Sequence, residues 1–280
     1  YRVKIYEIPE ASRTGKGQSV ATLLELAKDE VVTAAIPVRA VEKNQFLVMA
    51  TRHGVVKKTP LEEFENIRRS GIIAINLKDN DGLGWVQVTE GRQDIIFGTK
   101  HGIAIRFSED DARPMGRAAA GVRGINLEKG DEVISMDIID KEGDLLIISK
   151  QGFGKRVSTK EFRGQRRGGK GLRAIKMRKD DEVARLQLIS PQDEILMITA
   201  SGTLSRQKAG GISQQSRYAS GVRVQRIDAK DALVDFARVV NEETDIETAV
   251  GEDVAEAVEP TKIKVEVVPH KRKRKAKAAA

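Results

Sequence analysis

The chain has 280 residues, of which 40% are hydrophobic and 32% are charged, and its formal net charge is +8; this suits one large domain or two small ones with a buried core. It contains no cysteine, which excludes disulfides, thiolate zinc sites and cysteine nucleophiles, and it has no apolar run of about 18 residues to form a membrane-spanning helix. The positive charge indicates a polyanionic partner.

The first segment of the chain has the pattern of a β-strand. Residues 1–8 alternate apolar and polar side chains and do not resemble a signal peptide. Because the chain begins at Tyr1 inside this pattern, we expect residues 1–38 to be the later part of a repeated unit whose first strand lies upstream.

A repeat of 50 residues organises the chain as far as residue 240. Four segments that begin with glycine start 50 residues apart, at 71–77, 121–127, 171–177 and 221–227. Pairs ending in glycine follow at spacings of 48, 50 and 50 residues: His53-Gly54, His101-Gly102, Gln151-Gly152 and Ser201-Gly202. Self-similarity at this period is the signature of a repeat architecture.

The residues around each X-Gly pair predict a β-hairpin. Apolar runs such as 144–149 and 194–199 precede the pair and are typical of strands buried on both faces, while alternating strands such as 55–59 and 103–107 follow it. Glycine tolerates the positive φ of a tight turn. A basic loop and the glycine-led strand come next, and a closing strand ends the unit, at 133–136, 183–188 and 233–236.

Four strands per unit at this period predict an all-β fold of propeller-like blades. A single blade cannot bury both of its faces, so the blades must stack around an axis. We therefore expect one domain over residues 1–240, with a partial unit at 1–38 followed by four repeats.

The composition changes near residue 240. Residues 241–259 hold eight acidic residues and no Lys or Arg, whereas residues 271–277 hold six basic residues. Blocks of like charge are typical of disordered segments, so we expect residues 241–280 to be an acidic-then-basic disordered tail. Residues 1–240 carry a net charge of +9 and the tail carries −1, which places the positive charge on the repeats.

The densest basic segment lies between Glu161 and Asp180, where there are eight basic residues and no acidic one. At its centre is Gln-Arg-Arg-Gly-Gly-Lys-Gly, at 165–171. Arginine holds phosphate oxygens in a two-pronged manner, and the glycines let the backbone approach a nucleic acid strand and direct N–H groups at it. The segment predicts a phosphate clamp, in which Gln165 hydrogen-bonds a phosphate or a sugar.

This segment also resembles a known family. Residues 165–171 are identical to the seven-residue box that defines the C-terminal domain of the DNA gyrase A protein, and residues 6–11, 54–59, 113–116 and 121–124 resemble that family as well. The resemblance covers about residues 1–240. It implies a β-pinwheel, a six-bladed relative of the propeller in which neighbouring blades exchange strands.

The resemblance implies a function in DNA wrapping. Duplex DNA is expected to bend around the outer rim with a positive crossing, which the rest of gyrase converts into negative supercoils. The implied partners are duplex DNA, the upstream cleavage domains of the gyrase A protein, and the gyrase B protein in an A2B2 assembly. The implied location is the bacterial cytoplasm, at the nucleoid and not at a membrane. ATP and magnesium are expected to serve other parts of that enzyme, and this chain is expected to hold no cofactor and no catalytic residue.

The position of the box departs from the family pattern. The box that defines the family lies in the first blade, whereas here it lies in the fifth of six units by our count, where some members carry a second box. We therefore expect the first-blade box to lie upstream of Tyr1, which leaves the wrapping competence of this chain to be measured. The family also suggests that the acidic part of the tail competes with DNA, so that removing residues 241–280 raises DNA affinity.

The predicted DNA-binding residues are the box, the basic residues beside it and the equivalent residues of the other units. On several blades they form a continuous track, because one clamp would not offset the cost of bending DNA repeatedly. The predicted set is Gln165, Arg166, Arg167, Gly168, Gly169, Lys170, Gly171, Arg163, Arg173, Arg13, Lys16, Arg68, Arg69, Arg113, Arg117, Arg123, Arg217 and Arg223.

Other readings of these residues remain open. The C-terminal domain of topoisomerase IV is the nearest alternative, although it usually has fewer blades and a degraded box. A propeller that binds proteins would present an apolar or mixed-charge groove, and an enzymatic propeller would need clustered carboxylates, metal ligands or a nucleophile–base pair, none of which the sequence indicates.

Three smaller motifs favour structural roles. Residues 164–170 nearly match a phosphate-binding P-loop, but Gly171 stands where that loop needs Ser or Thr, and the flanking strand and helix are not predicted. Tyr218 beside Arg217 falls in the loop equivalent to the box, so a surface or stacking role is expected. His53 and His101 share the turn position with Gln151 and Ser201, which argues against metal or acid–base chemistry.

Overall fold

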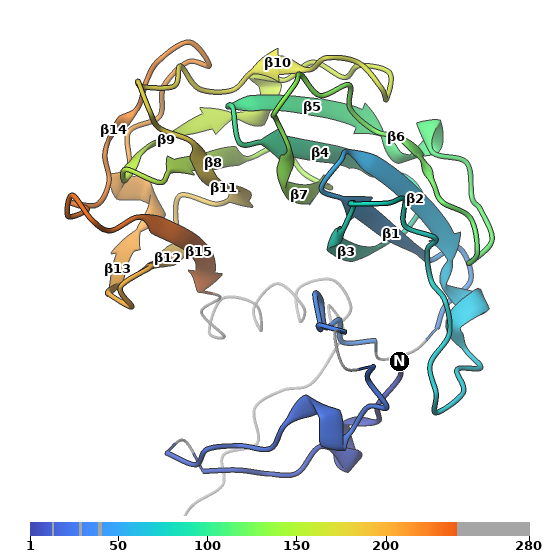
Figure 1. Ribbon diagram of the computed structural model, residues 1–280. Helices are drawn as coiled ribbons and strands as arrows, with labels where there is room; N and C mark the ends of the chain where they lie inside the picture. The colour runs from blue at the N-terminus through green and yellow to red at the C-terminus, as the bar shows by residue number, and fades with distance from the viewer. Residues whose placement is uncertain (13, 28–29, 39–40, 240–280) are drawn as a thin grey trace, which may run out of the picture. The chain divides into compact units, whose positions relative to one another are not determined.

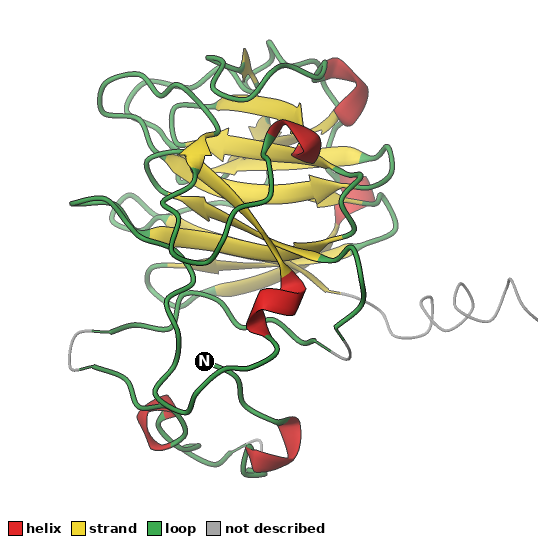
Figure 2. Cartoon of the chain, turned by 90° about the vertical axis from the view of Figure 1, so that its right-hand side faces the viewer, coloured by secondary structure: helices red, strands yellow, loops and turns green. Residues whose placement is uncertain are grey.

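The computed structural model describes residues 1–12, 14–27, 30–38 and 41–239. Within those ranges no helix is both long and apolar enough to cross a membrane. The helical turns are all short 3-10 turns, and β-strands make up the rest of the regular structure (Figure 2). The all-β class predicted from the repeat is therefore confirmed.

Each of the four complete units is built on a β-hairpin. Gly54, Gly102, Gly152 and Gly202 lie at the hairpin turns with φ values of 80°, 81°, 78° and 86°, the left-handed region that the tight turn requires. The hairpins are β1 (Phe46–Thr51) with β2 (Val55–Pro60), β4 (Asp94–Thr99) with β5 (Ile103–Ser108), β8 (Asp144–Ser149) with β9 (Phe153–Ser158), and β12 (Glu194–Thr199) with β13 (Leu204–Lys208).

A closing strand pairs antiparallel with the first strand of each hairpin. These strands are β3 (Leu83–Thr89), β7 (Val133–Ile139), β11 (Val183–Ile189) and β15 (Leu233–Val239). Neighbouring closing strands also contact one another: the backbone N–H of Leu186 donates to Oγ of Ser135 at 2.9 Å, and that of Leu188 donates to the Asp137 carboxylate at 2.7 Å. Burial raises the pKa of Asp137.

The fourth strand of a sheet comes from the next unit along the chain. β6 (Val122–Arg123) pairs with β2, β10 (Leu172–Arg173) with β5, and β14 (Val222–Arg223) with β9. The strand orders are β3-β1-β2-β6, β10-β5-β4-β7 and β11-β8-β9-β14, and a fourth sheet has the order β13-β12-β15 (Figure 1). The implied exchange of strands between neighbours is confirmed, although each exchanged strand is only two residues long.

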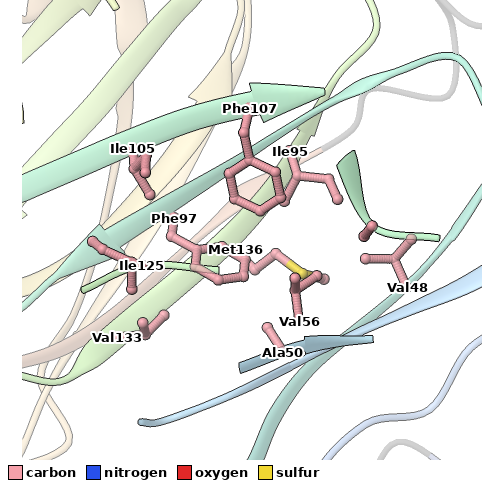
Figure 3. Close-up of a cluster of buried hydrophobic side chains, with 11 residues drawn as sticks. Val48, Ala50, Val56, Ile95, Phe97, Ile105, Phe107, Ile125, Val133 and Met136 are labelled. Carbon is pink, nitrogen blue, oxygen red and sulfur yellow. The ribbon is translucent and has the colours of Figure 1, made fainter. Parts of the chain in front are cut away.

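The hydrophobic core lies between neighbouring sheets. In the first cluster, Val48 and Val56 of the first sheet pack against Phe97 and Phe107 of the second, whose rings meet edge to face at 5.4 Å between centroids (Figure 3). Two further clusters lie between the second and third sheets and between the third and fourth. Each sheet therefore needs its neighbours to bury its apolar residues, as expected for stacked blades. Trp85 of β3 packs, partly buried, against the first cluster.

Two predicted strands are not formed. Residues 1–8 contain a 3-10 turn, η1 (Ile5–Glu7), and a second turn, η2 (Val20–Thr22), follows; residues 71–77 have no strand. An isolated strand leaves its backbone groups unpaired. The equivalents of 71–77 pair with a hairpin of the preceding unit, and no such hairpin occurs among the described residues of 1–38, so both segments lack a strand partner.

The last hairpin also differs from the prediction. Residues 194–199 were predicted to be buried on both faces, but Leu196 and Ile198 remain 37% and 39% exposed. No sheet in the described part of the chain covers that face. The predicted tail at 241–280 lies outside the described residues.

Candidate nucleic-acid interface

Three loops cross from one unit onto the second hairpin strand of the preceding sheet. They span 112–121, 162–171 and 212–221, and each follows a 3-10 turn: η4 (Glu109–Asp111), η5 (Thr159–Glu161) and η6 (Ala209–Gly211). The same backbone hydrogen bond ties each loop down: Met115 N–H donates to Lys58 O at 2.8 Å, Gln165 N–H to Arg106 O at 2.8 Å, and Gln215 N–H to Arg156 O at 2.9 Å.

These loops and the exchanged strands form one edge of the sheets, which we call the outer rim. It comprises β6, β10 and β14 with the loops 112–121, 162–171 and 212–221. The closing strands, which contact one another, lie at the opposite edge of each sheet. Because the repeat places a loop on each of three successive sheets, equivalent side chains recur along the outer rim.

The glycines of the box bring its backbone against protein. Gly171 has a φ of 77°, and a Cβ added there would lie 2.7 Å from Ala104 O of β5. The N–H of Gly168 donates to Gly124 O at 2.6 Å, and Gly169 O accepts from the Asn126 N–H at 2.8 Å. The close approach that the sequence suggested is thus made to the neighbouring unit.

The basic side chains of the box region divide into two groups. Arg163, Arg166 and Lys170 are exposed. Arg167 is half-buried, and its guanidinium donates to Asp111 O at 2.8 Å and to Arg123 O at 3.2 Å. Arginine can make two sets of contacts because its donors point in fixed, separate directions. Arg167 therefore anchors the loop, and the other three point their charge to solvent.

The arginines equivalent to Arg167 also contact the preceding unit, Arg217 through its guanidinium and backbone and Arg117 through its backbone N–H and an ion pair. The guanidinium of Arg217 donates to Arg173 O at 3.2 Å, and its backbone N–H donates to Glu161 at 3.0 Å. The backbone N–H of Arg117 donates to the Glu63 carboxylate at 3.2 Å, and its side chain lies 3.8 Å from that carboxylate. On each of the three loops, this arginine therefore ties the loop to the preceding unit.

The side chain of Gln165 is turned inward. Its amide nitrogen is buried and has no hydrogen-bond partner among the described residues. A Cβ added at Gly169 would lie 3.3 Å from the Gln165 Oε1 and 3.4 Å from Cδ1 of Ile105. The amide therefore lies beneath the loop, away from the position at which it would meet a phosphate.

Arginines of the exchanged strands complete the outer rim. Arg123, Arg173 and Arg223 are exposed. Because each exchanged strand joins the preceding sheet, Arg123 is brought beside the box: its Cδ lies 3.8 Å from a Cβ built at Gly168. Each basic cluster therefore combines residues from two units.

Two arginines stack on one aromatic ring, an arrangement that was not recognised from the sequence. The guanidinium carbons of Arg178 and Arg223 lie 3.8 Å and 4.8 Å from the centroid of the Phe153 ring. An aromatic face attracts such cations. The only signal in the sequence was an aromatic residue at the start of β9, where the other hairpins have Val55, Ile103 or, in the last, Thr203.

The remaining predicted DNA-binding residues do not contact the box. Lys16, Arg68, Arg69 and Arg113 are exposed, and Nε of Arg69 lies 3.6 Å from the Glu25 carboxylate. No contact in the described part of the chain joins any of them to the box. Arg13 lies outside the described residues.

The X-Gly turns are structural. The backbone N–H of His53, His101, Gln151 and Ser201 each donates to an aspartate about 30 residues further on, Asp81, Asp131, Asp181 or Asp231. Hydrogen bonding, first from the Ser201 hydroxyl, lowers the pKa of Asp231. The shared turn role predicted for the two histidines is confirmed, and the aspartates were not recognised from sequence.

Chemical sites of other kinds are not evident among the described residues. They contain no cluster of three or more His, Asp or Glu side chains arranged to hold a metal. Residues 164–170 follow a 3-10 turn and lead into the two-residue strand β10, so the strand and helix of a P-loop are not formed there.

Tyr218 is 63% exposed and stacks with Arg217, whose guanidinium carbon lies 5.0 Å from the ring centroid of Tyr218.

Both a family model and a full-length relative connect this chain with DNA gyrase. The family model described as the DNA gyrase C-terminal domain, beta-propeller, matches residues 1–39, 45–90, 93–140, 143–190 and 193–239, which follow the repeat units. The DNA gyrase A protein of Clostridium acetobutylicum is 49% identical over 122 residues, which cover 44% of this chain and 15% of that protein. The chain thus spans only a small part of the length of such relatives.

Two solved structures share the fold. The C-terminal domain of DNA topoisomerase IV aligns with a TM-score of 0.76 and 27% identity, covering 84% of this chain and 76% of that one. The DNA gyrase A C-terminal domain aligns with a TM-score of 0.75 and 26% identity, covering 86% and 78%. The sheets and their order therefore follow an architecture known from both enzymes.

Proposed function

The chain belongs to the DNA gyrase C-terminal domain family, and from that premise we propose that it binds and wraps duplex DNA around its outer rim without sequence specificity. The expected ligands are phosphate oxygens, because the exposed groups are cations and aromatic residues make up only 4% of the chain. Duplex should be preferred to single strands, and binding should weaken steeply with salt.

One observation carries this proposal: exposed cations recur along the outer rim, on two of its three loops and on its exchanged strands. Arg163, Arg166 and Lys170 lie on one loop, and Arg123 and Arg173 lie on exchanged strands beside the loops. Bending a short DNA site costs about 1–6 kcal/mol. Counterion release at several loops offsets that cost, whereas a single clamp would not.

The inward side chains refine the predicted site. We propose that Arg163, Arg166, Lys170, Arg123, Arg173 and Arg223 contact phosphates directly. Arg167, Arg117, Arg217 and Gln165 are instead expected to hold the loops, because their polar groups are used within the protein or are buried beneath the loop. Lys16, Arg68, Arg69 and Arg113 extend the track as exposed cations.

Membership of the family supports a role within a larger enzyme. We propose that the chain serves an ATP-dependent type IIA topoisomerase, with the gyrase B protein in an A2B2 assembly at the bacterial nucleoid. Cleavage, religation and ATP hydrolysis, with magnesium, would belong to other parts, and no cofactor is assigned to this chain.

Topoisomerase IV remains the alternative enzyme, since the two solved domains align almost equally well, at TM-scores of 0.76 and 0.75. The intact box at 165–171 favours gyrase. A protein-binding scaffold is disfavoured by the basic character of the loops.

The test is closure of nicked plasmid in the presence of the chain, followed by removal of protein and separation of topoisomers. A positive linking difference that grows with protein concentration is the expected result. Binding without a change in linking would separate DNA binding from wrapping, and only the binding part of the proposal would stand. Absence of binding even at low salt would refute the proposal and favour the scaffold.

A further inference from the structure

Two lysines are buried beneath loops of the outer rim. Lys57 and Lys155 are the third residues of β2 and β9, and both are 0% exposed. Their ammonium groups donate to backbone carbonyl oxygens, and each reaches one carbonyl of the crossing loop. Lys155 donates to Ser216 O at 2.5 Å, and Lys57 donates to Ala74 O at 2.6 Å and to Arg117 O.

Packing alone does not require a charge at this position. The equivalent residue of β5 is Ile105, which is also 0% exposed and lies beneath the box loop. Burying an ammonium group is unfavourable without compensating partners. Desolvation is the main cause that lowers the pKa of Lys57, and it lowers that of Lys155 to about 8. An apolar side chain fills the same space without that cost.

Two of the carbonyl groups that these lysines hold, those of Arg117 and Ser216, lie near the centre of their loops. Ser216 directly precedes Arg217, which reaches back to Arg173 O, and Arg117 is the equivalent anchor of the preceding loop. A carbonyl oxygen drawn inward fixes the direction of the adjoining peptide planes. The side chains at the tip of the loop are thereby kept on the outer surface.

The box loop is held by other contacts. Beneath it lie Ile105 and the amide of Gln165, and the N–H of Gly168 donates to Gly124 O of the preceding unit. All three loops also accept one backbone bond from that unit, donated by the N–H of Asn76, Asn126 or Lys176. Beyond this shared bond, two loops are held by a buried ammonium and the third by the Gly168 contact.

We propose that Lys57 and Lys155 are positioning residues of the outer rim, which hold loop carbonyl oxygens from below and so set the positions of the neighbouring exposed arginines, Arg113 on loop 112–121 and Arg223 on β14 directly after loop 212–221. This inference rests on the proposed DNA-binding function. It assigns to each lysine a role through the loop and no contact with DNA, since neither side chain reaches the surface.

The experiment uses the full chain and a labelled duplex of about 40 base pairs, with affinity measured by fluorescence anisotropy at two salt concentrations. Lys155→Met is the test variant, and Lys155→Ile, which copies Ile105, is a second variant should the first fold poorly. Ile105→Met is the matched control at the same strand position. Lys150→Met controls for loss of one charge, because Lys150 is exposed at a hairpin turn and paired with Glu182.

Lys155→Met is expected to weaken duplex binding by roughly three- to tenfold, whereas both controls stay within about twofold of the wild type. Amide hydrogen exchange in residues 213–219, measured without DNA, should become faster in Lys155→Met and not in Ile105→Met. In an Arg217→Ala background the effect of Lys155→Met on affinity should largely disappear, since both act through one loop.

Other outcomes distinguish the positioning role of the lysines from the proposed binding of DNA. Wild-type affinity and unchanged exchange in both Lys155 variants would overturn the positioning role while leaving DNA binding intact. An undiminished effect of Lys155→Met in the Arg217→Ala background would also overturn it. Failure of the wild-type chain to bind duplex would refute the proposed function itself, and the positioning role with it.

Discussion

The third and fourth sheets are built from nearly the same sequence pattern but differ in what covers them. In β8, Leu145 and Ile147 face the core shared with the second sheet, and Leu146 and Ile148 face the core shared with the fourth. In β12, Ile195 and Met197 face a core, but Leu196 and Ile198 stay partly exposed. The burial of a blade residue therefore depends on the neighbouring sheet as much as on its own strand.

The same contrast applies to the outer rim. The third sheet receives β14 and the loop 212–221 from the next unit, whereas no described segment pairs with the outer edge of β13. The third sheet thus gains Arg217 and Arg223 from the next unit, and the fourth sheet in the described part of the chain gains no such residues. Substitutions at equivalent positions of the third and fourth sheets can therefore measure what a neighbouring sheet or an added segment contributes to stability and to DNA binding.

The largest difference is expected at the third residue of β8 and of β12. Leu146→Ala should reduce the free energy of unfolding by about 2–5 kcal/mol, because it leaves a cavity between two sheets. Leu196→Ala should cost less than about 1.5 kcal/mol, because that side chain is already 37% exposed. Urea denaturation of both variants would measure the difference; equal losses would show that β12 is covered in solution.

A similar contrast is expected at the hairpin turns. Gly152→Ala should cost roughly 2–4 kcal/mol, because φ is positive there and a Cβ would collide with Gln225 O. Gly202→Ala has the same strained backbone but no atom within 4 Å of its Cβ, so only about 1–2 kcal/mol is expected. Thermal unfolding of the two variants would test this, and a cost at Gly202 as large as at Gly152 would contradict it.

Lys155 adds a pH dependence that the fourth sheet, with Ser205 at this position, lacks. Burial lowers the pKa of Lys155 from 10.5 to about 8 in the folded state. Between these values the unfolded chain binds the proton and the folded chain does not, so this group makes stability rise with pH across that window. Below about pH 8 both states are protonated and the cost of burial is complete.

The free energy of unfolding of Lys155→Met minus that of the wild type should therefore be larger at pH 7.5 than at pH 10, by roughly 1–3 kcal/mol. Denaturation of both proteins at the two pH values would measure this difference, and titration of the other lysines largely cancels in the comparison. Ser205→Met should show no such trend. A pH-independent difference for Lys155→Met would mean that its ammonium is not buried in solution.

The smallest effects concern DNA affinity. Arg166→Ala, on the loop over the second sheet, should weaken duplex binding several-fold and lower the salt dependence by about one phosphate contact. Lys208→Ala removes an exposed cation from β13, where no described loop crosses, and should leave affinity within about twofold. Salt titrations of binding would compare them; an equal loss at Lys208 would extend the DNA track onto the fourth sheet.

Several features of the fold followed from the sequence alone. The spacing of the X-Gly pairs and the apolar runs placed the hairpins, and β8 and β12 have the bounds that were predicted. A run of apolar residues flanked by turn residues is a local signal, so it can be recognised without knowing the neighbours. The box at 165–171 and its resemblance to a family likewise required only the order of residues.

Other features could not be recognised, because they depend on which residues meet across units. Gln165 and Arg167 belong to the same basic segment as Arg166, yet one lies beneath the loop and the other anchors it. Lys155 and Arg156 are adjacent cations in sequence, but only Lys155 holds a loop from below, while Arg156 pairs with Asp144.

The sequence by itself determined the repeat, the hairpins and the positive charge of the loops, because strand periodicity and turn chemistry act over a few residues. The tertiary structure alone decided which strands were exchanged, which apolar faces were covered and which cations reached the surface. Pairing of β14 with β9 and the contact of Lys155 with Ser216 join residues about 60 to 70 positions apart. Such contacts form only when one blade packs against the next, since each blade completes the sheet and core of its neighbour.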